Sequence, residues 1–287
     1  MDRGIIYLLA GDSYAELFCT SLWSLRTHGA YNGPVTVFAI DGQAGSIAHE
    51  IAEDKRLSLD VRVIDPVRVK RHQSYVTKPQ LTRETPYKRT VFLDADTIVQ
   101  GPLDELFLPQ LAITQFCAWV STGKIVGGRI RQWLGISPML DALVERAVAF
   151  HYPAINTGVF GFHKDFGGLP AWRSVTRQGA KRSFTDELAM QLLFPDWPDC
   201  QVLDDRFNKS VKFGSNLDQA RVLHFHGRKH VRWDPGWEMW RPWFEAARVA
   251  DAGGMLRWGG RRDPGVRARL RQERRLARTD RKTSEAA

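Results

Sequence analysis

The sequence is poor in cysteine and contains no long apolar run. Among its 287 residues, the cysteines are Cys19, Cys117 and Cys200, and no Cys-x-x-Cys pair occurs. This argues against a disulfide framework or a zinc knuckle and fits a reducing compartment, so we expect a cytoplasmic protein. No stretch approaches about 18 uninterrupted apolar residues, which argues against a membrane-spanning helix. Strand-like sequence begins at Gly4, so we expect no signal peptide.

The sequence also lacks two nucleotide-binding signatures. No Gly-x-Gly-x-x-Gly follows the first strand-like segment and no Walker-type loop occurs, so dinucleotide-binding and P-loop proteins have little support. What is present is an alternation of strand-like and helix-like segments, which predicts an α/β protein with a layered sheet. We expect strands at residues 4–10, 35–40, 59–64, 90–94, 112–119, 155–162, 201–203 and 221–226, and helices at 15–28, 47–52 and 186–194.

The positive charge is concentrated at the C-terminal end. The net charge is +9, and residues 261–287 contribute +6 of it through ten basic and four acidic residues. This basic tail has few apolar residues and no aromatic ring. It could be a solvated or frayed helix, or it could contact an anionic membrane surface with about 1 kcal/mol per basic residue. Specific nucleic-acid binding is disfavoured because stacking aromatic residues are absent.

Two segments stand apart from the alternation. Residues 120–154 contain glycines at 123, 127 and 128 and an amphipathic helix near 139–150. This insertion could form a lid or acceptor platform, or it could be a packing subdomain. Residues 236–260 follow as a tryptophan-rich extension that we expect to be helical. Four tryptophans between residues 233 and 243 could stack on sugar rings or pack internally.

The most informative motif is the Asp-x-Asp pair formed by Asp94 and Asp96. An apolar run over residues 90–93 precedes it, and a second one over 97–99 follows it. A strand that ends on this motif places both carboxylates at the carboxyl edge of the sheet, where open α/β folds bind ligands. Adjacent carboxylates repel each other, and a divalent cation resolves that cost, usually with a diphosphate as a second ligand. The motif therefore predicts a cation site.

Further candidate ligands lie before and after this motif. Lys78 could neutralise a phosphate or contact a donor sugar, or it could be an ordinary surface lysine. Asn156 stands ahead of a predicted buried strand and could read hydroxyl groups with both a donor and an acceptor. Asp186 begins a predicted helix, so its carboxylate could complement the helix N-terminus or face the substrate.

A pair of histidines closes the last predicted strand. His224 and His226 share a strand face, which raises the question of a two-histidine zinc site. The sequence offers no obvious third zinc ligand nearby. We therefore expect His224 to join the two aspartates at one cation and His226 to be structural. Gly227 would admit a phosphate there, and Lys229 would screen its charge.

In this order, the motifs resemble those of the retaining, nucleotide-sugar-dependent glycosyltransferases of family 8, which includes glycogenin and the bacterial lipopolysaccharide galactosyltransferases. The resemblance covers about residues 4–233. It implies a GT-A nucleotide-diphospho-sugar transferase fold over residues 1–235, with a central, mostly parallel sheet flanked by helices. It also implies that Asp94, Asp96 and His224 bind Mn²⁺ or Mg²⁺.

The resemblance further assigns the donor site. Tyr14 matches the aromatic residue that contacts uracil, and Asn208 matches an asparagine before the last strand. Asp186 and Asn156 are the implied catalytic residues. The implied substrate-binding residues are Leu8, Ala10, Tyr14, Lys78, Asp94, Ala95, Asp96, Asn156, Thr157, Asp186, Glu187, His224, Gly227 and Lys229.

Three positions depart from the family pattern. Glu187 stands where the family has glutamine, which bears on the identity of the sugar. Ala10 replaces a polar residue of the first loop. Lys229 follows Gly227 by two residues rather than three, and His230 takes the third place.

The resemblance implies a metal-dependent, retaining transfer of a hexose from a UDP-sugar to a saccharide, lipid-linked or protein acceptor. The cation would stabilise the departing diphosphate, and Asp186 would stabilise positive charge at the anomeric carbon. One alternative is a protein of the same fold that binds nucleotide sugars without turnover. A second is a phosphatase of the haloacid dehalogenase type, although that family places threonine four residues after the first aspartate and Thr97 is three after Asp94. The basic tail suggests peripheral contact with the inner face of a membrane.

Overall fold

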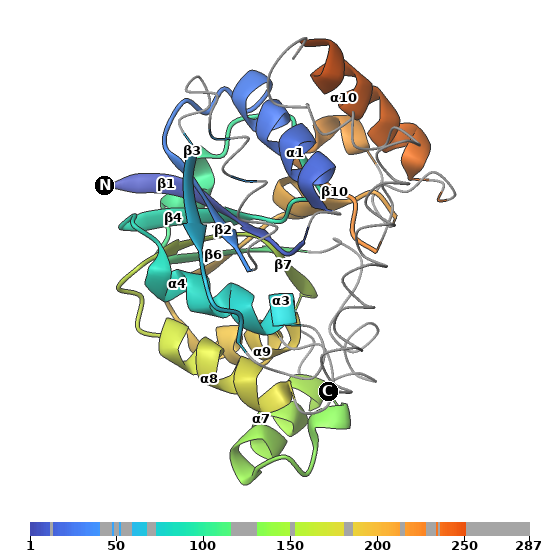
Figure 1. Cartoon of the computed structure of the whole chain (residues 1–287). Coiled ribbons are helices and arrows are strands. Elements are labelled where there is room, and N and C mark those ends of the chain that lie inside the picture. Colours follow the sequence, from blue (N-terminus) through green and yellow to red (C-terminus); the bar gives the residue numbers. More distant parts are fainter. Residues whose placement is uncertain are drawn as a thin grey trace, which may run out of the picture.

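A seven-stranded sheet forms the centre of the molecule (Figure 1), with the strand order β3-β2-β1-β4-β7-β6-β8. Neighbouring strands are parallel, except that β7 runs antiparallel to both β4 and β6. This confirms the predicted mixed, mostly parallel α/β sheet. The strands are β1 (Arg3–Leu9), β2 (Val35–Ala39), β3 (Leu59–Val63), β4 (Arg89–Leu93), β6 (Leu111–Gln115), β7 (Ile155–His163) and β8 (Cys200–Leu203). This computed structural model describes residues 1–11, 14–40, 48, 52, 59–67, 73–115, 131–149, 153–180, 186–212, 216–227, 234 and 236–250.

Helices cover both faces of this sheet. In Figure 1, α1 and α10 lie together on one face, and α3, α4, α8 and α9 lie on the other. Alternation along β1 explains the two cores, because successive side chains of a strand point to opposite faces. Ile5 and Tyr7 pack in the core beneath α1, whereas Ile6 packs in the core that contains Trp172 and Leu188. The helices are α1 (Ala15–Thr27), α3 (Gln73–Thr77), α4 (Leu81–Glu84), α7 (Pro138–Ala149), α8 (Leu169–Gly179), α9 (Asp186–Leu193) and α10 (Trp237–Ala250).

A second, three-stranded sheet lies beside the first. It consists of β5 (Thr97–Val99), β10 (Val222–His224) and β9 (Lys209–Ser210), in the order β5-β10-β9. Strand β10 is antiparallel to β5 and parallel to β9, and its register sets His224 opposite Thr97. The last of the described strands along the chain, β10, is therefore the central strand of this sheet. Short 3-10 helices complete the described chain: η3 (Lys78–Gln80), η4 (Asp104–Phe107), η5 (Arg131–Trp133), η6 (Phe194–Asp196), η7 (Asp205–Asn208) and η8 (Leu217–Gln219).

The sequence prediction did not include the helices α3, α4 and α8 or the strands β5 and β9. Helix α8 buries Trp172, Val175 and Thr176, which share one helical face, but charged and polar neighbours hide this period in the sequence. Strand β9 has only two residues, which is too short to produce a pattern. Most of the helix predicted at 47–52 and the predicted strand end at 116–119 lie outside the described residues.

The described part of the insertion packs onto the core. Trp133 in η5 is fully buried, and a Cβ on Gly179 of α8 would lie 2.3 Å from its ring. Helix α7 contributes Leu140 and Val144 to the core that contains Trp172, and it contacts α9. Residues 120–130, with the predicted glycine-rich bend, lie outside the described part. Within the described residues, none of the helices combines the length and apolar character needed to cross a membrane.

Helix α10 carries three of the four clustered tryptophans. Trp240 is 2% exposed, and its ring meets that of Phe225 at 5.0 Å between centroids. Trp243 meets the rings of Trp23 and His28. These contacts pack α10 against the core beneath α1. The fourth, Trp233, and the basic tail over residues 261–287 lie outside the described residues.

Candidate functional site

The candidate site is built on the turn that joins β4 to β5. Asp94 follows the last residue of β4, and Asp96 precedes the first residue of β5. Backbone hydrogen bonds hold the turn from two sides: the Asp94 N–H donates to the Gly158 carbonyl (2.7 Å), and the Phe225 N–H donates to the Asp96 carbonyl (2.9 Å). The two carboxylates therefore stand on a fixed turn at the carboxyl edge of β4, as the strand pattern predicted.

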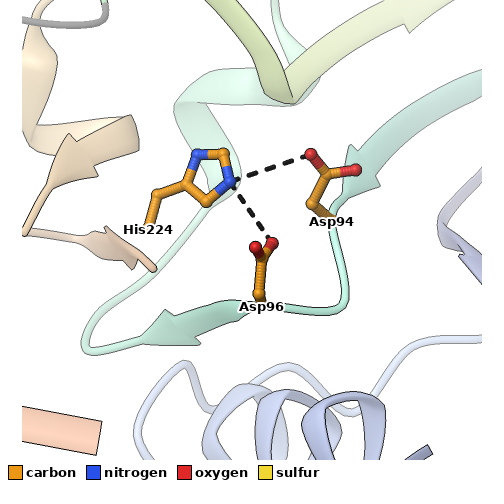
Figure 2. A group of neighbouring side chains, drawn as sticks. All are labelled: Asp94, Asp96 and His224. Carbon is orange, nitrogen blue, oxygen red and sulfur yellow. Dashed lines mark ion pairs between the residues drawn. The ribbon is translucent and has the colours of Figure 1, made fainter. Parts of the chain in front are cut away.

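His224 reaches this turn from the second sheet (Figure 2). Its Nε2 lies 3.3 Å from Asp96 Oδ1 and 3.8 Å from Asp94 Oδ2. One ligand atom from each of the three side chains falls within 4.8 Å of the others. The antiparallel pairing of β10 with β5 explains the approach, because it sets His224 opposite the residue that follows Asp96. The three predicted metal ligands thus come together.

Gly158 provides the space that the imidazole occupies. A Cβ at this position would lie 2.2 Å from His224 Cε1 and 2.8 Å from Asn156 Oδ1. Contacts under 3 Å between carbon atoms are strongly repulsive. A side chain at residue 158 would therefore displace His224 or Asn156. Gly158, the glycine of the Asn-Thr-Gly sequence, therefore lets the imidazole of His224 lie close to the backbone of β7.

The charges at this cluster favour a bound cation. Burial lowers the pKa of His224, but the neighbouring carboxylates of Asp96 and Asp94 outweigh burial and raise the pKa above its ordinary value. Burial raises the pKa of Asp94 against the opposing charge of Lys78, and Asp96 adds to the rise. The cluster therefore takes up positive charge, either as a proton or as a metal ion. Two carboxylates and one imidazole suit a borderline-hard divalent cation such as Mn²⁺, and Mg²⁺ also accepts oxygen ligands, so the donor set fits the predicted ion.

Lys78 ties the cluster to Asp186. Its Nζ lies 3.0 Å from Asp94 Oδ1 and 3.2 Å from Asp186 Oδ2, and it donates to the Thr157 carbonyl at 3.2 Å. These three acceptors match the three protons of an ammonium group. Burial opposes the charge, but Asp94 and Asp186 raise the pKa of Lys78 above its ordinary value. Asp186, the first residue of α9, also accepts a hydrogen bond from the Thr157 hydroxyl at 2.8 Å.

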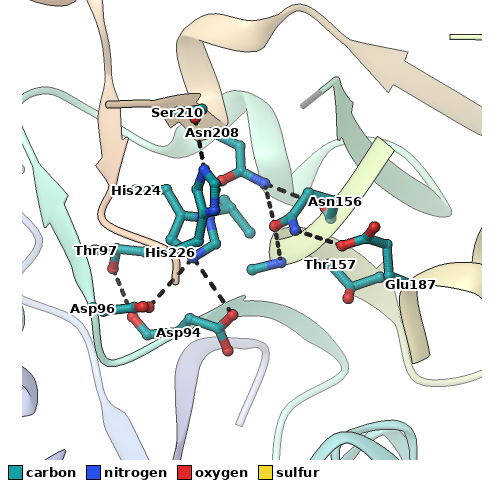
Figure 3. A network of polar contacts seen from close by, with 12 residues as sticks. Asp94, Asp96, Thr97, Asn156, Thr157, Glu187, Asn208, Ser210, His224 and His226 are labelled. Atoms are coloured by element: carbon teal, nitrogen blue, oxygen red, sulfur yellow. Dashed lines mark hydrogen bonds and ion pairs between the residues drawn. The ribbon is translucent and has the colours of Figure 1, made fainter. Parts of the chain in front are cut away.

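Glu187 follows Asp186 in α9 and pairs with Asn156. Asn156 is the second residue of β7, and its Nδ2 donates to Glu187 Oε2 at 2.7 Å. Its Oδ1 accepts from the Gly158 N–H (2.7 Å) and from Asn208 Nδ2 (3.1 Å). Figure 3 shows this network running from Glu187 through both asparagines to His224. The candidate metal ligands and the candidate sugar-contacting residues therefore form one hydrogen-bonded set.

Solved structures share this fold. The galactosyltransferase LgtC, in complex with donor and acceptor sugar analogues, is 14% identical and covers 85% of this chain and 95% of its own, with a TM-score of 0.57. An active-site mutant of LgtC, with glutamate in place of glutamine, is 15% identical over 86% of this chain and 95% of its own, also with a TM-score of 0.57. The bifunctional glycosyltransferase WbbM is 14% identical over 79% of this chain and 46% of its own, with a TM-score of 0.51. The chain has the GT-A glycosyltransferase fold. No family model matches it, and no curated protein matches it in sequence.

The remaining predicted residues take their places within this GT-A fold. Leu8 and Ala10 lie at the end of β1, which pairs with β4, so they lie next to the strand that carries Asp94. Tyr14 precedes α1 and is 44% exposed, and Ala95 is buried between the two aspartates. Gly227 has a φ of +69°, a left-handed conformation that favours glycine, and, its chain neighbours apart, no atom of the described residues lies within 4 Å of a Cβ built there. Lys229 and His230 lie outside the described residues.

The structure of this GT-A site adds residues that the motifs did not single out. Thr114 of β6 accepts a hydrogen bond from Asn208 Nδ2 at 2.9 Å, yet a threonine inside an apolar strand gives no signal. Tyr75 in α3 lies close enough to the site for its charges to affect the tyrosine. Burial raises the pKa of Tyr75 to about 12, and the charges of Lys78, Asp94 and Asp186 also shift this pKa. A tyrosine on a short helix is ordinary in a sequence, so only the fold reveals its place near the site.

His226 has a separate environment from His224. Its Nε2 lies 2.7 Å from the Ser210 hydroxyl of β9, and its ring stands 5.5 Å from that of His224, measured between centroids. Within the described residues, the cluster that could hold a metal consists of Asp94, Asp96 and His224 and does not include His226. A structural role for His226 therefore stays our prediction.

Proposed function

We propose that the protein is a metal-dependent, retaining glycosyltransferase that moves a hexose from a UDP-sugar donor to a saccharide, lipid-linked or protein acceptor. The observation that carries this proposal is the convergence of Asp94, Asp96 and His224 at the edge of a GT-A sheet, with Asp186 tied to Asp94 through Lys78. The likeness to LgtC, a galactosyltransferase whose structure contains donor and acceptor sugar analogues, supports the same class of reaction.

In this proposal, Asp94, Asp96 and His224 hold Mn²⁺ or Mg²⁺. When bound, the cation supplies charge stabilisation for the departing diphosphate. The donor diphosphate would lie beside these ligands and close to Gly227, which has no side chain and, its chain neighbours apart, has none of the described residues within 4 Å of its Cβ position. Lys229 would add positive charge to the same diphosphate.

The sugar would lie over Asp186, Asn156 and Glu187. Asp186 accepts hydrogen bonds from Lys78 and Thr157, which hold its carboxylate in one orientation. There it would stabilise the positive charge that develops at the anomeric carbon of an oxocarbenium-like transition state. The departing phosphate oxygen would accept the proton of the acceptor hydroxyl on the same face of the sugar. This route gives retention and requires no side-chain base.

The first test is hydrolysis of a panel of UDP-sugars by the full chain in the presence of Mn²⁺. We expect turnover of at least one UDP-hexose, loss of activity on chelation, and no activity in Asp94→Asn or Asp96→Asn. Asp104→Asn serves as the matched control, since Asp104 is an exposed aspartate of η4 that pairs with Arg3 of β1. Full activity in either site variant would end the proposal.

The same experiment separates the alternatives. Binding of UDP without any product from the whole panel would favour a nucleotide-sugar-binding protein of the same fold. Release of phosphate from a generic phosphomonoester would favour a phosphatase. Glu187, which carries a carboxylate where the family has an amide, makes the binding-only alternative the more important one to exclude.

We further propose that the protein works in the cytoplasm, with peripheral contact between its basic tail and the inner face of a membrane. The +6 charge of residues 261–287 supports this placement, because anionic lipids attract clustered basic residues. A lipid-linked acceptor would be presented at that surface. The insertion over residues 120–154 is the proposed lid or acceptor platform.

A further inference from the structure

A continuous series of side-chain hydrogen bonds joins Glu187 to His224 (Figure 3). Asn156 Nδ2 donates to Glu187 Oε2 at 2.7 Å, and Asn208 Nδ2 donates to Asn156 Oδ1 at 3.1 Å. Asn208 Oδ1 then lies 2.8 Å from His224 Nδ1. The series is buried at the His224 end, where Asn208 is 0% and His224 is 2% exposed. Water cannot readily replace a partner there, so each amide must be satisfied by the protein.

The orientation of Asn156 follows from its neighbours. The backbone N–H of Gly158 can only donate, and it points at one end of the Asn156 amide at 2.7 Å. That end is therefore the oxygen. The opposite end faces Glu187, whose ionised carboxylate can only accept, so it is the nitrogen. Both ends agree, and the Asn156 amide has one allowed orientation.

The orientation of Asn208 follows in turn. One end of its amide faces the Asn156 side-chain oxygen at 3.1 Å and the Asn156 backbone carbonyl at 3.2 Å. Both of these atoms only accept, so this end of Asn208 is the nitrogen. The same nitrogen meets the Thr114 hydroxyl at 2.9 Å, whose own proton goes to the Val159 carbonyl at 2.7 Å. The other end of Asn208, which faces His224, is the amide oxygen.

This orientation determines which imidazole nitrogen carries the proton. An amide oxygen can only accept, so Nδ1 of His224 must donate to it. A neutral imidazole has one N–H, which leaves Nε2 with a lone pair. Nε2 is the nitrogen that faces Asp94 and Asp96.

We propose that Asn208 is a positioning residue that keeps the proton of His224 on Nδ1 and so directs the Nε2 lone pair at a divalent cation. The inference rests on the proposed cation site of the transferase but concerns a residue that does not touch the cation. Through Asn156, the same series ends on Glu187 in the proposed sugar site. The residue proposed to contact the sugar, Glu187, and the metal ligand His224 are therefore held by the same series of hydrogen bonds. Groups that orient a metal ligand in this way typically change metal affinity about 10–100-fold when they are removed.

Two substitutions distinguish positioning from packing. Asn208→Leu keeps the branched shape of the side chain but removes the acceptor from Nδ1, so the proton can occupy either nitrogen. Asn208→Asp keeps an acceptor toward Nδ1 but loses the N–H donor to Asn156 and Thr114, so it tests the acceptor alone. We expect Asn208→Leu to weaken Mn²⁺ binding about 10–100-fold, and Asn208→Asp to bind Mn²⁺ at least as tightly as the unmodified protein. A similar loss of Mn²⁺ affinity in both variants would overturn the proposal and show that Asn208 contributes by packing alone.

A measurement on the unmodified chain makes the test independent of how the variants fold. The ¹⁵N spectrum of histidine-labelled, metal-free protein, recorded at a pH where the imidazole is neutral, reports the tautomer of His224 directly. The signal is assigned by its absence in His224→Asn. We expect the proton on Nδ1, and a proton on Nε2 would refute the inference. Because this measurement uses neither metal nor donor, a failure of the transferase proposal would appear separately, as absence of Mn²⁺ binding or of UDP-sugar turnover.

Discussion

Replacing Lys78 with methionine tests the electrostatic balance of the site. The side chain is 5% exposed, and its ammonium lies 3.0 Å from Asp94 and 3.2 Å from Asp186. At an effective dielectric constant of about 20, each contact amounts to about 5 kcal/mol of Coulomb attraction, most of which desolvation of the buried charges offsets. Removing one partner of a buried pair and leaving its acceptors behind costs about 3–5 kcal/mol. Methionine keeps much of the volume, so the charge is the main change.

We expect Lys78→Met to lower the free energy of unfolding by about that amount when no divalent cation is present. A bound cation neutralises the same carboxylates, so Mn²⁺ should restore more stability to this variant than to the unmodified chain. The affinity for Mn²⁺ alone should rise, because an ammonium group no longer competes for Asp94. Urea unfolding with and without Mn²⁺, together with a Mn²⁺ titration followed by electron paramagnetic resonance, measures all three quantities.

Lys209→Met is the matched control for this experiment. Lys209 also holds a buried ion pair, 2.8 Å from Asp205, with both side chains 11% exposed. This variant should lose stability in a similar way and leave the Mn²⁺ affinity unchanged. The reasoning fails if Lys78→Met loses less than about 1 kcal/mol of stability, or if its affinity for Mn²⁺ alone decreases.

Two further predictions concern the same site, and a third concerns the basic tail. Gly158→Ala should cost about 1–3 kcal/mol of stability and weaken Mn²⁺ binding, since its Cβ would lie 2.2 Å from His224; Gly167→Ala, where nothing lies within 4 Å of a Cβ, should change neither. Equal effects in both variants would contradict this. Because neighbouring carboxylates raise the pKa of His224, its charged form stabilises the metal-free fold fully below the unfolded-state value of about 6.5, and this contribution is lost as pH rises through the raised pKa. Cation affinity should therefore increase with pH across that interval, and a pH-independent affinity in calorimetry would refute the assignment. Removal of residues 261–287 should abolish sedimentation with phosphatidylserine vesicles and spare UDP-sugar hydrolysis. Neutral vesicles are the control, and the absence of any binding by the full chain would disprove the proposed contact.

The fold could be predicted where one strand or helix carries its own signal. The apolar run before Asp94 indicated β4, and the carboxyl edge followed from its end. The direction of β7 could not be inferred in this way, because the apolar pattern of a strand buried on both faces is the same whether the strand runs parallel or antiparallel to its neighbours. Helix α8 carried a helical period in Trp172, Val175 and Thr176, but its charged neighbours concealed it.

The site could be predicted in part for a different reason. Asp94 and Asp96 are adjacent in sequence, so their chemistry is visible locally. His224 is distant in sequence; the chemistry of one imidazole beside two carboxylates and the family resemblance both led us to expect it there, whereas the pairing of β10 with β5 that brings it there was not predicted. Asn208 and Thr114 act through hydrogen bonds whose direction depends on every neighbour, and no spacing rule encodes that. The parts left unpredicted are those that exist only after the chain has folded.

The central place of β10 in the small sheet has a consequence for how the protein is made. Because β10 lies between β5 and β9, neither of its partners has a sheet to join until the last strand arrives. A chain still emerging from the ribosome can expose Asp94 and Asp96 but has no His224 to set beside them. A chain that ends before β10 would therefore carry the two aspartates without the third ligand of the proposed cation site.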